Sequence, residues 1–295
     1  MEEFVQLIVT GLVIGAVYAL VAMGFALIYK ATSIINFAQG EFVLVGGYVC
    51  LWLYNTYHMN IVVAFGLTMV IAVLMGIVLE RLILRPMIGE PIISVIMITI
   101  ALALVLKSLV TILWGTQIQV FTPPIFSQEA IRMGPVRISE VYIWTFGFAF
   151  LFLAIFAAFF KFTRVGISMR AVANNQQVAQ SMGISVKRVF AISWSIGALV
   201  SAVGGILVGN INGINIALSD FGLKVFPAVI LGGLESIGGA IIGGLTIGVL
   251  ENIMGSYLDV YLGGGVKEIA PFIVLILILM IKPYGLFGIK EIERV

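Results

Sequence analysis

The chain has 295 residues, of which 61% are hydrophobic and only 10% are charged, and its formal net charge is +2 at neutral pH. A soluble domain normally has about a quarter of its residues charged, which keeps its surface hydrated. This composition therefore excludes a water-soluble domain and predicts a protein embedded in a lipid bilayer. The apolar runs are long and continuous, so they predict α-helices rather than the short alternating strands of a membrane β-barrel.

Glycine and cysteine add further constraints. The 33 glycines fall inside apolar segments, where they allow helices to approach closely. The one cysteine, Cys50, can form neither an intrachain disulfide nor a thiolate metal site. The N-terminus has no basic stretch before its apolar core, so we expect a retained first span and not a cleaved signal peptide.

Apolar runs of about twenty residues mark the membrane spans, because a helix of that length crosses the hydrocarbon core. In chain order the expected spans are 5–29, 37–55, 61–84, 92–114, 140–160, 188–209, a short piece at 222–233, a glycine-rich span at 236–255, and 267–282. The expected fold class is thus an all-α polytopic membrane protein with about eight or nine transmembrane helices. The number is nine if the piece at 222–233 crosses, and eight if it is a half-span that dips and returns.

Lysine and arginine in the short connections set the expected orientation, because basic residues favour cytoplasmic loops. With the N-terminus outside and the C-terminus inside, 11 of the 16 basic residues lie inside: Lys30, Arg81, Arg85, Lys161, Arg164, Arg170, Lys187, Arg188, Lys282, Lys290 and Arg294. Arg132, Arg137, Lys224 and Lys267 would lie outside, and Lys107 lies within a span. This orientation requires an odd number of crossings, so it fails if 222–233 does not cross.

Two stretches, 11–47 and 197–233, resemble each other and would enter the membrane from opposite sides. Each has a glycine-bearing span, a polar break and an apolar piece that ends in Gly-Gly. Inverted repeats are typical of transporters, whose solute path runs at the repeat interface. We expect a single permease domain over 1–295, with a first repeat over about 5–114 and a second over about 188–282. The alternative is chance similarity between glycine-rich stretches.

Polar or glycine-rich breaks interrupt the apolar segments where a solute path could run. Asn36, Gln39 and Glu41 follow the first span; they would line the path, or Asn36 and Gln39 would cap the next helix. Gly232 and Gly233 lie between two later apolar segments and predict a broken helix, for which tight packing is the simpler interpretation. These five residues are the candidate translocation pathway.

Other polar residues lie near the spans. The stretch 210–220 contains three asparagines and favours a turn. Lys107 and Glu251 are either buried functional charges or side chains that reach out of the membrane from span ends. Glycines four residues apart within 239–248 have the spacing that lets helix backbones touch.

The longest inside connection contains a candidate docking segment for another protein. Residues 168–182 contain neither proline nor glycine, and Gly183 stands where a helix would end. A short helix at the cytoplasmic surface is therefore expected, with a mild apolar face that would fit a groove on a partner. The alternative is an interfacial loop without a partner. The face would consist of Ala171, Val172, Asn175, Val178, Ala179 and Met182.

Four stretches of the sequence resemble a known family. They are Gly15-Ala-Val-Tyr-Ala-Leu-Val-Ala-Met-Gly24, Ile35-Asn-Phe-Ala-Gln-Gly-Glu41, Gly166-Ile-Ser-Met-Arg-Ala-Val-Ala173 and Val229-Ile-Leu-Gly-Gly-Leu-Glu-Ser-Ile-Gly-Gly239. In these stretches, which cover both halves, the chain resembles the permeases of high-affinity branched-chain amino acid ABC importers (LivH type). The Glu-Ala-Ala signature of many importer permeases is absent, and Arg170-Ala-Val-Ala stands in its place.

The resemblance implies an ATP-driven importer of branched-chain amino acids, in a bacterial inner membrane. Relatives of this type also carry urea, short amides or other small organic solutes. The implied partners are a second homologous permease, two ATP-binding subunits inside, a periplasmic solute-binding protein and membrane lipid, but no nucleic acid. The segment at about 164–187 would be the coupling helix that docks on an ATP-binding subunit. Its assigned residues are Arg170, Ala171, Val172, Ala173, Asn174, Asn175, Ala179, Met182 and Gly183.

Two other classes of protein are less well supported by the residues. A stand-alone secondary transporter or channel would need coupling charges within its spans, and few are convincing. An intramembrane enzyme would need a nucleophile with a base or a metal cluster, and the only histidine, His58, is expected at an outside surface. We therefore expect no catalytic residue, metal site or cofactor. No phosphate-binding loop occurs, so ATP would bind only to partner subunits.

Overall fold

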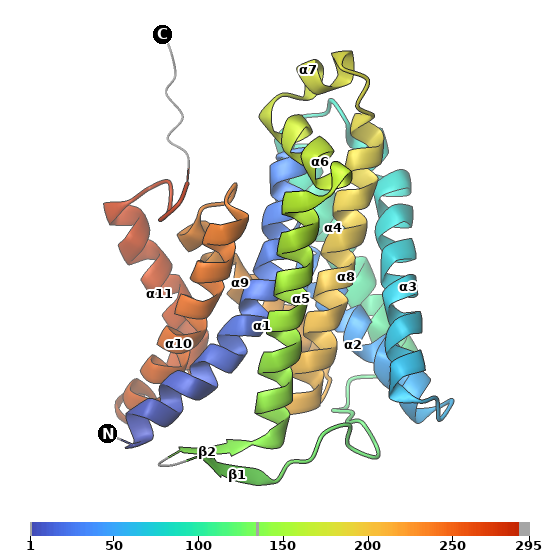
Figure 1. The fold of residues 1–295 in the computed structure, drawn as a ribbon. Helices are drawn as coiled ribbons and strands as arrows, with labels where there is room; N and C mark the ends of the chain where they lie inside the picture. Colours follow the sequence, from blue (N-terminus) through green and yellow to red (C-terminus); the bar gives the residue numbers. More distant parts are fainter. Residues whose placement is uncertain (1, 134–135, 289–295) are drawn as a thin grey trace.

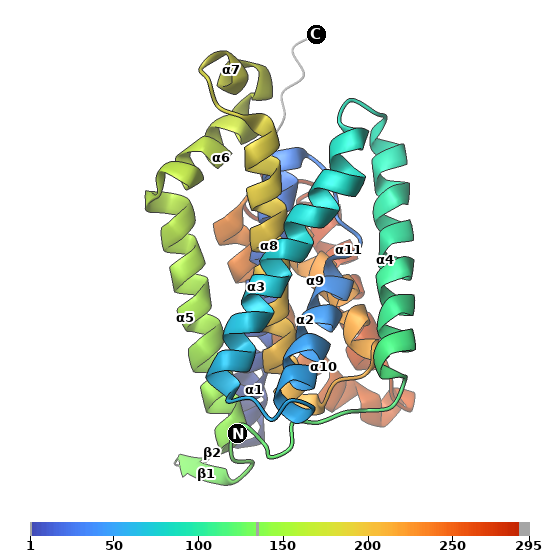
Figure 2. The ribbon, with the colours of Figure 1, turned by 90° about the vertical axis from the view of Figure 1, so that its right-hand side faces the viewer.

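A computed structural model describes residues 2–133 and 136–288. It is an all-α bundle with a short β-hairpin at one end and two short helices, α6 and α7, at the other (Figures 1 and 2). Each expected span contains a helix.

The first half of the chain contributes four helices, whose apolar runs contain no internal proline. These helices are α1 (Glu2–Thr32), α2 (Gln39–Asn55), α3 (Ile61–Leu79) and α4 (Ile92–Trp114). Helix α3 continues through one turn of π-helix and one of 3-10 helix to Met87. In the π turn the Glu80 side chain is completely buried and forms an ion pair with Arg85, whose Nη2 lies 2.8 Å from Oε2.

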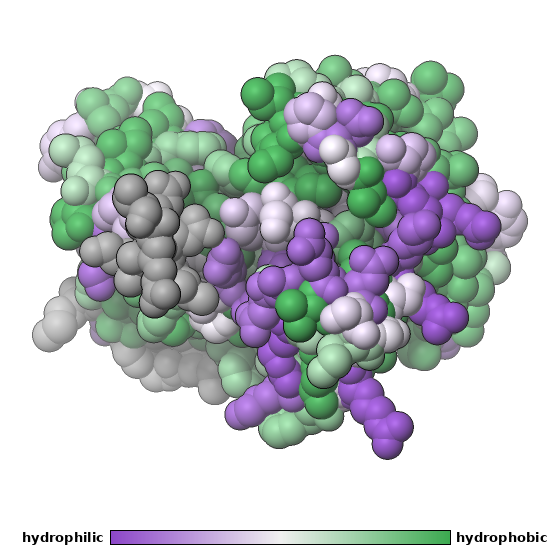
Figure 3. Space-filling model, turned by 90° about the horizontal axis from the view of Figure 1, so that it is seen from above, coloured by the Kyte–Doolittle hydropathy of each residue, from purple (hydrophilic) through white to green (hydrophobic). Residues whose placement is uncertain are grey.

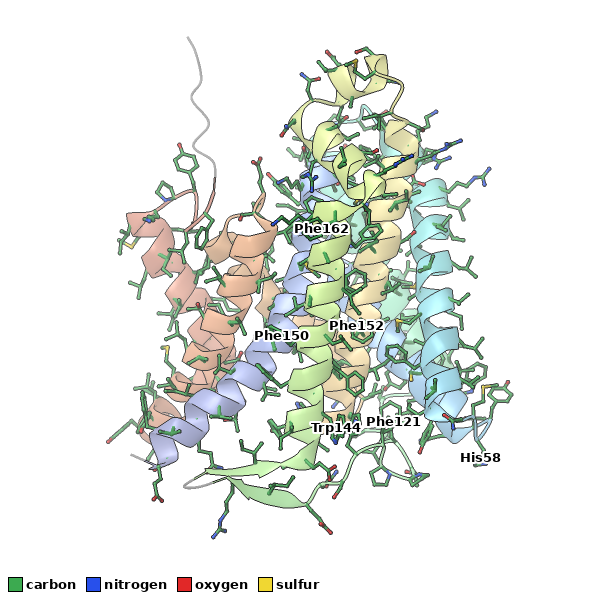
Figure 4. The ribbon with its side chains drawn as sticks, viewed as in Figure 1. His58, Phe121, Trp144, Phe150, Phe152 and Phe162 are labelled. Carbon is green, nitrogen blue, oxygen red and sulfur yellow. The ribbon has the colours of Figure 1, made fainter. Side chains whose placement is uncertain are left out.

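The middle of the chain forms a hairpin, a long helix and two short helices. Strands β1 (Ala130–Met133) and β2 (Val136–Ser139) pair antiparallel, with Ile131 opposite Ile138. Helix α5 (Glu140–Phe162) then runs the length of the bundle to α6 (Arg164–Asn174) and α7 (Gln176–Ser181). Along α5, Trp144 and Phe162 lie near opposite ends, and Phe150 is exposed between them (Figure 4).

The second half repeats the pattern of long helix, break and short helix. Helix α8 (Val186–Asn212) is followed by one 3-10 turn (Ile216–Ser219) and by α9 (Asp220–Gly232). Helices α10 (Ile237–Leu262) and α11 (Val266–Ile281) complete the bundle.

The short helix α9 belongs to a pass that crosses the bundle. Its 13 residues rise only about 20 Å, less than the ~30 Å of a hydrocarbon core. However, α8 ends near the hairpin, where Ile214 exchanges backbone hydrogen bonds with Gln119, and α10 begins at the α6 end. The residues between α8 and α9, which include the 3-10 turn, therefore complete the crossing. In the described chain nine passes run between the two ends of the bundle, and six of them contain a helix that is long and apolar enough to cross a membrane. Helix α1 begins at the end of the bundle opposite to that where α11 finishes (Figure 1).

Helices α1 and α8 form the centre of the bundle. In their most apolar windows, 89% of α1 and 78% of α8 are buried, against only 17% of α5. The two helices run in opposite directions and contact each other. Helix α10 packs on α1 as α3 packs on α8, and α9 contacts α1 as α2 contacts α8. The first four and last four helices thus make matching contacts. The inverted repeat over these helices stays a prediction.

Glycines bring helices of the two halves together at backbone distance. A Cβ atom at Gly248 of α10 would overlap the backbone of Gly15 of α1, and one at Gly244 would overlap the backbone of Ala19. Gly239 and Gly243 approach the carboxyl half of α9 in the same way. The predicted role of the glycine spacing in helix contact is therefore confirmed.

Replacing Gly248 with alanine should loosen the contact between α1 and α10. Because the methyl group has no space beside Gly15, we expect a loss of roughly 1–3 kcal/mol in the free energy of unfolding. The measurement is unfolding in mixed detergent micelles. The matched control is Gly66→Ala in α3, where nothing lies near the added Cβ, so stability should hold or rise by up to about 1 kcal/mol. Equal losses in both variants would refute the backbone-contact explanation.

Candidate functional site: a projecting helical cap and two broken passes

The candidate docking segment forms two helices rather than one. The prediction of a single helix over 168–182 was wrong, because the backbone at Asn175 is extended, with φ −161° and ψ 112°. Asn175 instead caps α7, since its Oδ1 accepts a hydrogen bond of 2.9 Å from the backbone N–H of Val178. Gly183 follows α7 with φ +84°, a conformation that favours glycine, so the predicted helix end at this position is confirmed.

The two helices bury one set of apolar side chains and expose another. Met169, Val172 and Ala179 are buried against the adjoining ends of α1 and α8. Val178 and Met182 are exposed, with 57% and 78% of their surface accessible. The predicted apolar face is therefore divided, because the break at Asn175 turns α7 relative to α6. Ala171 and Ala173 are half-buried, and Asn174 is exposed.

Arg170 holds the connection between α5 and α6. Its Nη1 donates hydrogen bonds to the carbonyl oxygens of Phe160 (2.6 Å) and Lys161 (3.2 Å), and its guanidinium lies over the ring of Phe160. These are carbonyls that a helix end leaves without partners inside the helix. Gly166 permits the sharp bend, because a Cβ there would overlap the carbonyl of Phe160. The bend between α5 and α6 is consequently held against the end of α5 by Arg170.

Basic and polar side chains surround this end of the bundle. Figure 3 views it from above and shows hydrophilic surface gathered among apolar atoms. A polar cavity of about 410 Å³ lies here, lined by Lys30, Lys161, Arg170 and Glu235. Glu235 is exposed, as one would expect of a residue at the membrane surface.

At the first break, the predicted pathway residues Asn36 and Gln39 form a buried hydrogen-bond network. Asn36 Nδ2 donates to Gln39 Oε1 (3.0 Å), and Asn36 Oδ1 accepts from the backbone N–H of Ala38 (3.1 Å). Gln39 Nε2 donates to Ser201 Oγ of α8 (2.7 Å) and to the Gly197 carbonyl (3.3 Å). The N-cap position of α2 is Ala38, so the network ties the start of α2 to α8 rather than forming a capping box.

Charged residues meet where α2 and α9 begin. Gly40 of α2 and Gly222 of α9 are in backbone contact, so the amino ends of the two helices lie together. Glu41 is buried beside them, with Lys107 and Asp220 near enough to act electrostatically on its carboxylate. Lys107 Nζ lies 3.6 Å from Asp220 Oδ1. Lys107 is thus a paired charge on α4 and not a side chain that reaches out alone.

A second group of charges lies between α1, α9, α10 and α11. Lys224 Nζ lies 3.5 Å from Glu251 Oε1 and 2.6 Å from Glu268 Oε2. Glu251 is 2% exposed and accepts a hydrogen bond of 2.6 Å from the Tyr18 hydroxyl. Lys224, which is predicted on the outside, lies in the first half of α9 and pairs with both carboxylates. Burial of a lone ammonium group is costly, and the two carboxylates offset that cost.

A polar cavity of about 410 Å³ opens beside these charges, toward the hairpin end. Its lining combines charged, amide and apolar side chains, among them Asp220, Lys224, Glu268, Asn215, Leu218 and Phe221. The turn predicted over 210–220 forms one wall and is confirmed, with Gly213 at φ +75°. His58 is exposed at the same end of the bundle, as predicted (Figure 4).

Gly232 and Gly233 lie at the opposite end of this pass. They end α9, and Gly233 adopts φ +97° before Ser236 caps α10 by accepting from the N–H of Gly239 (3.0 Å). A Cβ at Gly232 would overlap Gly239, and one at Gly233 would overlap Gly288. Both glycines are buried in a tight helical corner, which is the broken helix that the sequence predicts. Their part in translocation stays a prediction.

The charged cluster contains residues that the sequence interpretation did not select. Tyr18, Lys224 and Glu268 are not among the predicted site residues, and Glu251 is predicted to be either a buried charge or one that reaches out of the membrane. The available signal was the presence of ionisable residues within apolar segments. Pairing between α9, α10 and α11 could be seen only in three dimensions.

This combination of nine passes, interrupted helices and a projecting cap defines a polytopic membrane permease. A sequence model of the family described as "Branched-chain amino acid transport system / permease component" matches residues 7–281. The chain belongs to this family, which consists of transport permease components and not of enzymes.

Relatives with curated names extend over nearly the whole chain. LivH of Salmonella typhimurium, named a high-affinity branched-chain amino acid transport system permease protein, is 32% identical over 99% of this chain and 98% of its own. BraD of Pseudomonas aeruginosa, named likewise, is 30% identical over 99% and 98%. These matches confirm the resemblance to LivH-type permeases.

A solved structure shares the fold at low sequence identity. It is PsaBC from Streptococcus pneumoniae in complex with Fab, with a TM-score of 0.51, 14% identity, and coverage of 96% of this chain and 92% of that chain. At this identity the similarity concerns the arrangement of the helices.

A double-mutant cycle on Gln39→Ala and Ser201→Ala should reveal the link between α2 and α8. We expect a coupling of about 0.5–2 kcal/mol in the free energy of unfolding, because each change removes the partner of the other. The control cycle pairs Gln39→Ala with Ser193→Ala, whose hydroxyl bonds to Val189 of its own helix, and should be additive within about 0.5 kcal/mol. Additivity in both cycles would rule out the link.

Proposed function

We propose that this chain is the membrane-spanning permease of an ATP-driven importer that carries branched-chain amino acids or similar small solutes into the cytoplasm. It would form a single permease domain over residues 1–295, with inverted repeats at about 5–114 and 188–282. ATP would bind to two partner subunits, with a second homologous permease beside this chain and a periplasmic solute-binding protein outside. Membership of a family described by branched-chain amino acid transport supports this proposal.

The distribution of basic residues supports an orientation with α6 and α7 in the cytoplasm of a bacterial inner membrane. Lys30, Arg85, Lys161 and Arg164 lie at or near the α6 end of their helices. Since basic residues favour the cytoplasmic side, the N-terminus lies outside and the C-terminus inside. Lys290 and Arg294, which were counted on the same side, lie outside the described residues.

The cap formed by α6 and α7, at about 164–187, is the proposed contact with an ATP-binding subunit. Exposed Val178 and Met182 are apolar side chains that a groove on a partner would cover. The cap is fastened at both ends, to α5 by Arg170 and to α8 by the buried Ala179. A push on the cap would therefore move α8, and through Ser201 it would reach Gln39 at the start of α2. This route connects ATP-driven motion to the broken passes.

The polar cavity beside α9, at the hairpin end, favours an amino acid over the alternative solutes. It presents Lys224 together with Asp220 and Glu268, so both signs of charge are available. An amino acid carries an ammonium and a carboxylate group, whereas urea and short amides carry neither. The cavity also has the apolar wall that a branched aliphatic side chain requires.

Placing aspartate at Val178 and Met182 should detach the ATP-binding subunits. A carboxylate buried against an apolar groove loses its hydration, so we expect recovery of these subunits with the affinity-purified permease to fall about tenfold or more. The matched control is Ile88→Asp, an exposed apolar residue at the same end but outside the cap, 46% accessible. Recovery should be unchanged in the control. Full recovery with the double variant would exclude α7 as the contact.

A further inference from the structure

We propose that the polar cavity beside α9 is an entry site that binds the zwitterionic head of an amino acid by exchanging the ion pair between Lys224 and Glu268. This inference rests on the proposed function and deepens it by assigning the place where the solute is first held. The cavity, of about 410 Å³, falls in the range of small-molecule sites and opens toward the end opposite the cap.

Lys224 is positioned to receive a carboxylate. Glu251, which is 2% exposed and is held by the Tyr18 hydroxyl, fixes the ammonium group from the buried side. The other partner of Lys224 is Glu268, whose side chain is 64% exposed. A solute carboxylate can therefore take the place of Glu268 while Lys224 keeps its buried partner. The exchange leaves no buried charge unpaired, so its cost is small.

The released carboxylate supplies the second half of the site. Glu268 and Asp220 both line the cavity, and the Asp220 side chain is 58% exposed. Glu268 can pair with the ammonium group of the solute once it has left Lys224, while Asp220, the partner of Lys107, adds a second carboxylate to the lining. A solute with only a negative charge would leave Glu268 without a new partner, and a solute with only a positive charge would bring no carboxylate to Lys224. A molecule that carries both charges matches the lining.

The remaining walls fit an aliphatic side chain beside a polar head. Val208, Leu218 and Phe221 form the apolar part, while Asn212 and Asn215 add amide groups at the mouth. The Phe221 ring also packs on Tyr18, with centroids 4.6 Å apart. The apolar wall and the buried end of the ionic network are thus held by the same helix, α1.

Protection of an engineered thiol tests this site directly. Cys50 is buried, so a membrane-impermeant thiol reagent should label Ala217→Cys, where the replaced residue is exposed on the cavity wall. The complete transporter would be used in sealed vesicles, without ATP and without the solute-binding protein. L-leucine should slow labelling several-fold. Leucinamide, which lacks the carboxylate, and the corresponding α-keto acid, which lacks the ammonium group, should not.

Control variants separate the site from general effects. Thr56→Cys lies at the same end but away from the cavity, so leucine should leave its labelling unchanged. Lys224→Gln should weaken the protection of Ala217→Cys about tenfold, the effect of losing ~1.4 kcal/mol. Lys267→Gln removes an exposed charge outside the cavity lining and should retain protection. If Lys224→Gln fails to fold, the comparison of leucine with its two derivatives still tests whether the site requires both charges of the solute.

Equal protection by leucinamide, or none by leucine, would overturn the entry site. Uptake is measured on vesicles prepared in the same way, with ATP enclosed and the solute-binding protein added outside, and it separates the two proposals. Leucine accumulation without protection would refute the entry site and leave the importer standing. Protection without ATP-dependent accumulation would support the site and refute import.

Discussion

Backbone contact between helices of the two halves is the constraint on which the architecture depends. Membrane helices gain little from burying apolar side chains, because lipid is equally apolar, so close packing and hydrogen bonds must hold them together. Gly15 meets Gly248 between α1 and α10, and Gly40 meets Gly222 between α2 and α9. The second contact brings two helix beginnings together inside the bundle. Glu41 and the ion pair between Lys107 and Asp220 lie beside that meeting point.

The breaks before α2 and α9 interrupt backbone hydrogen bonding, and neighbouring groups in the structure offset this free-energy cost. Backbone groups without partners are expensive where water is excluded, so broken helices occur only where protein groups or a cavity satisfy them. At the first break, Asn36 Oδ1 accepts a hydrogen bond from the backbone N–H of Ala38. At the second break, Ile214 exchanges backbone hydrogen bonds with Gln119. Charges gather at the same depth, where paired carboxylates and lysines can be tolerated. A membrane protein that keeps ionisable groups there uses them for function more often than for stability.

Most of the fold could be predicted from the sequence, because about twenty apolar residues are a strong signal for a helical pass. The break at Gly233 could also be predicted, because Gly232 and Gly233 lie between two apolar segments. The single helix over 168–182 could not be excluded by composition, since only the hydrogen bond from Val178 to Asn175 shows that the chain turns there. Counting charges in loops does not predict the ion pairs of Lys224, because such a count ignores partners on other helices. Its partners Glu251 and Glu268 lie on two other helices, so no local sequence pattern predicts these ion pairs.

The composition of the native complex tests the central claim most directly. The chain would be purified under mild solubilisation from its own membrane, and the accompanying proteins identified and quantified by mass spectrometry. The account predicts a second, homologous permease and two ATP-binding subunits. Recovery of the chain alone, or only as a homo-oligomer without an ATPase, would contradict it and would favour a secondary transporter or a channel.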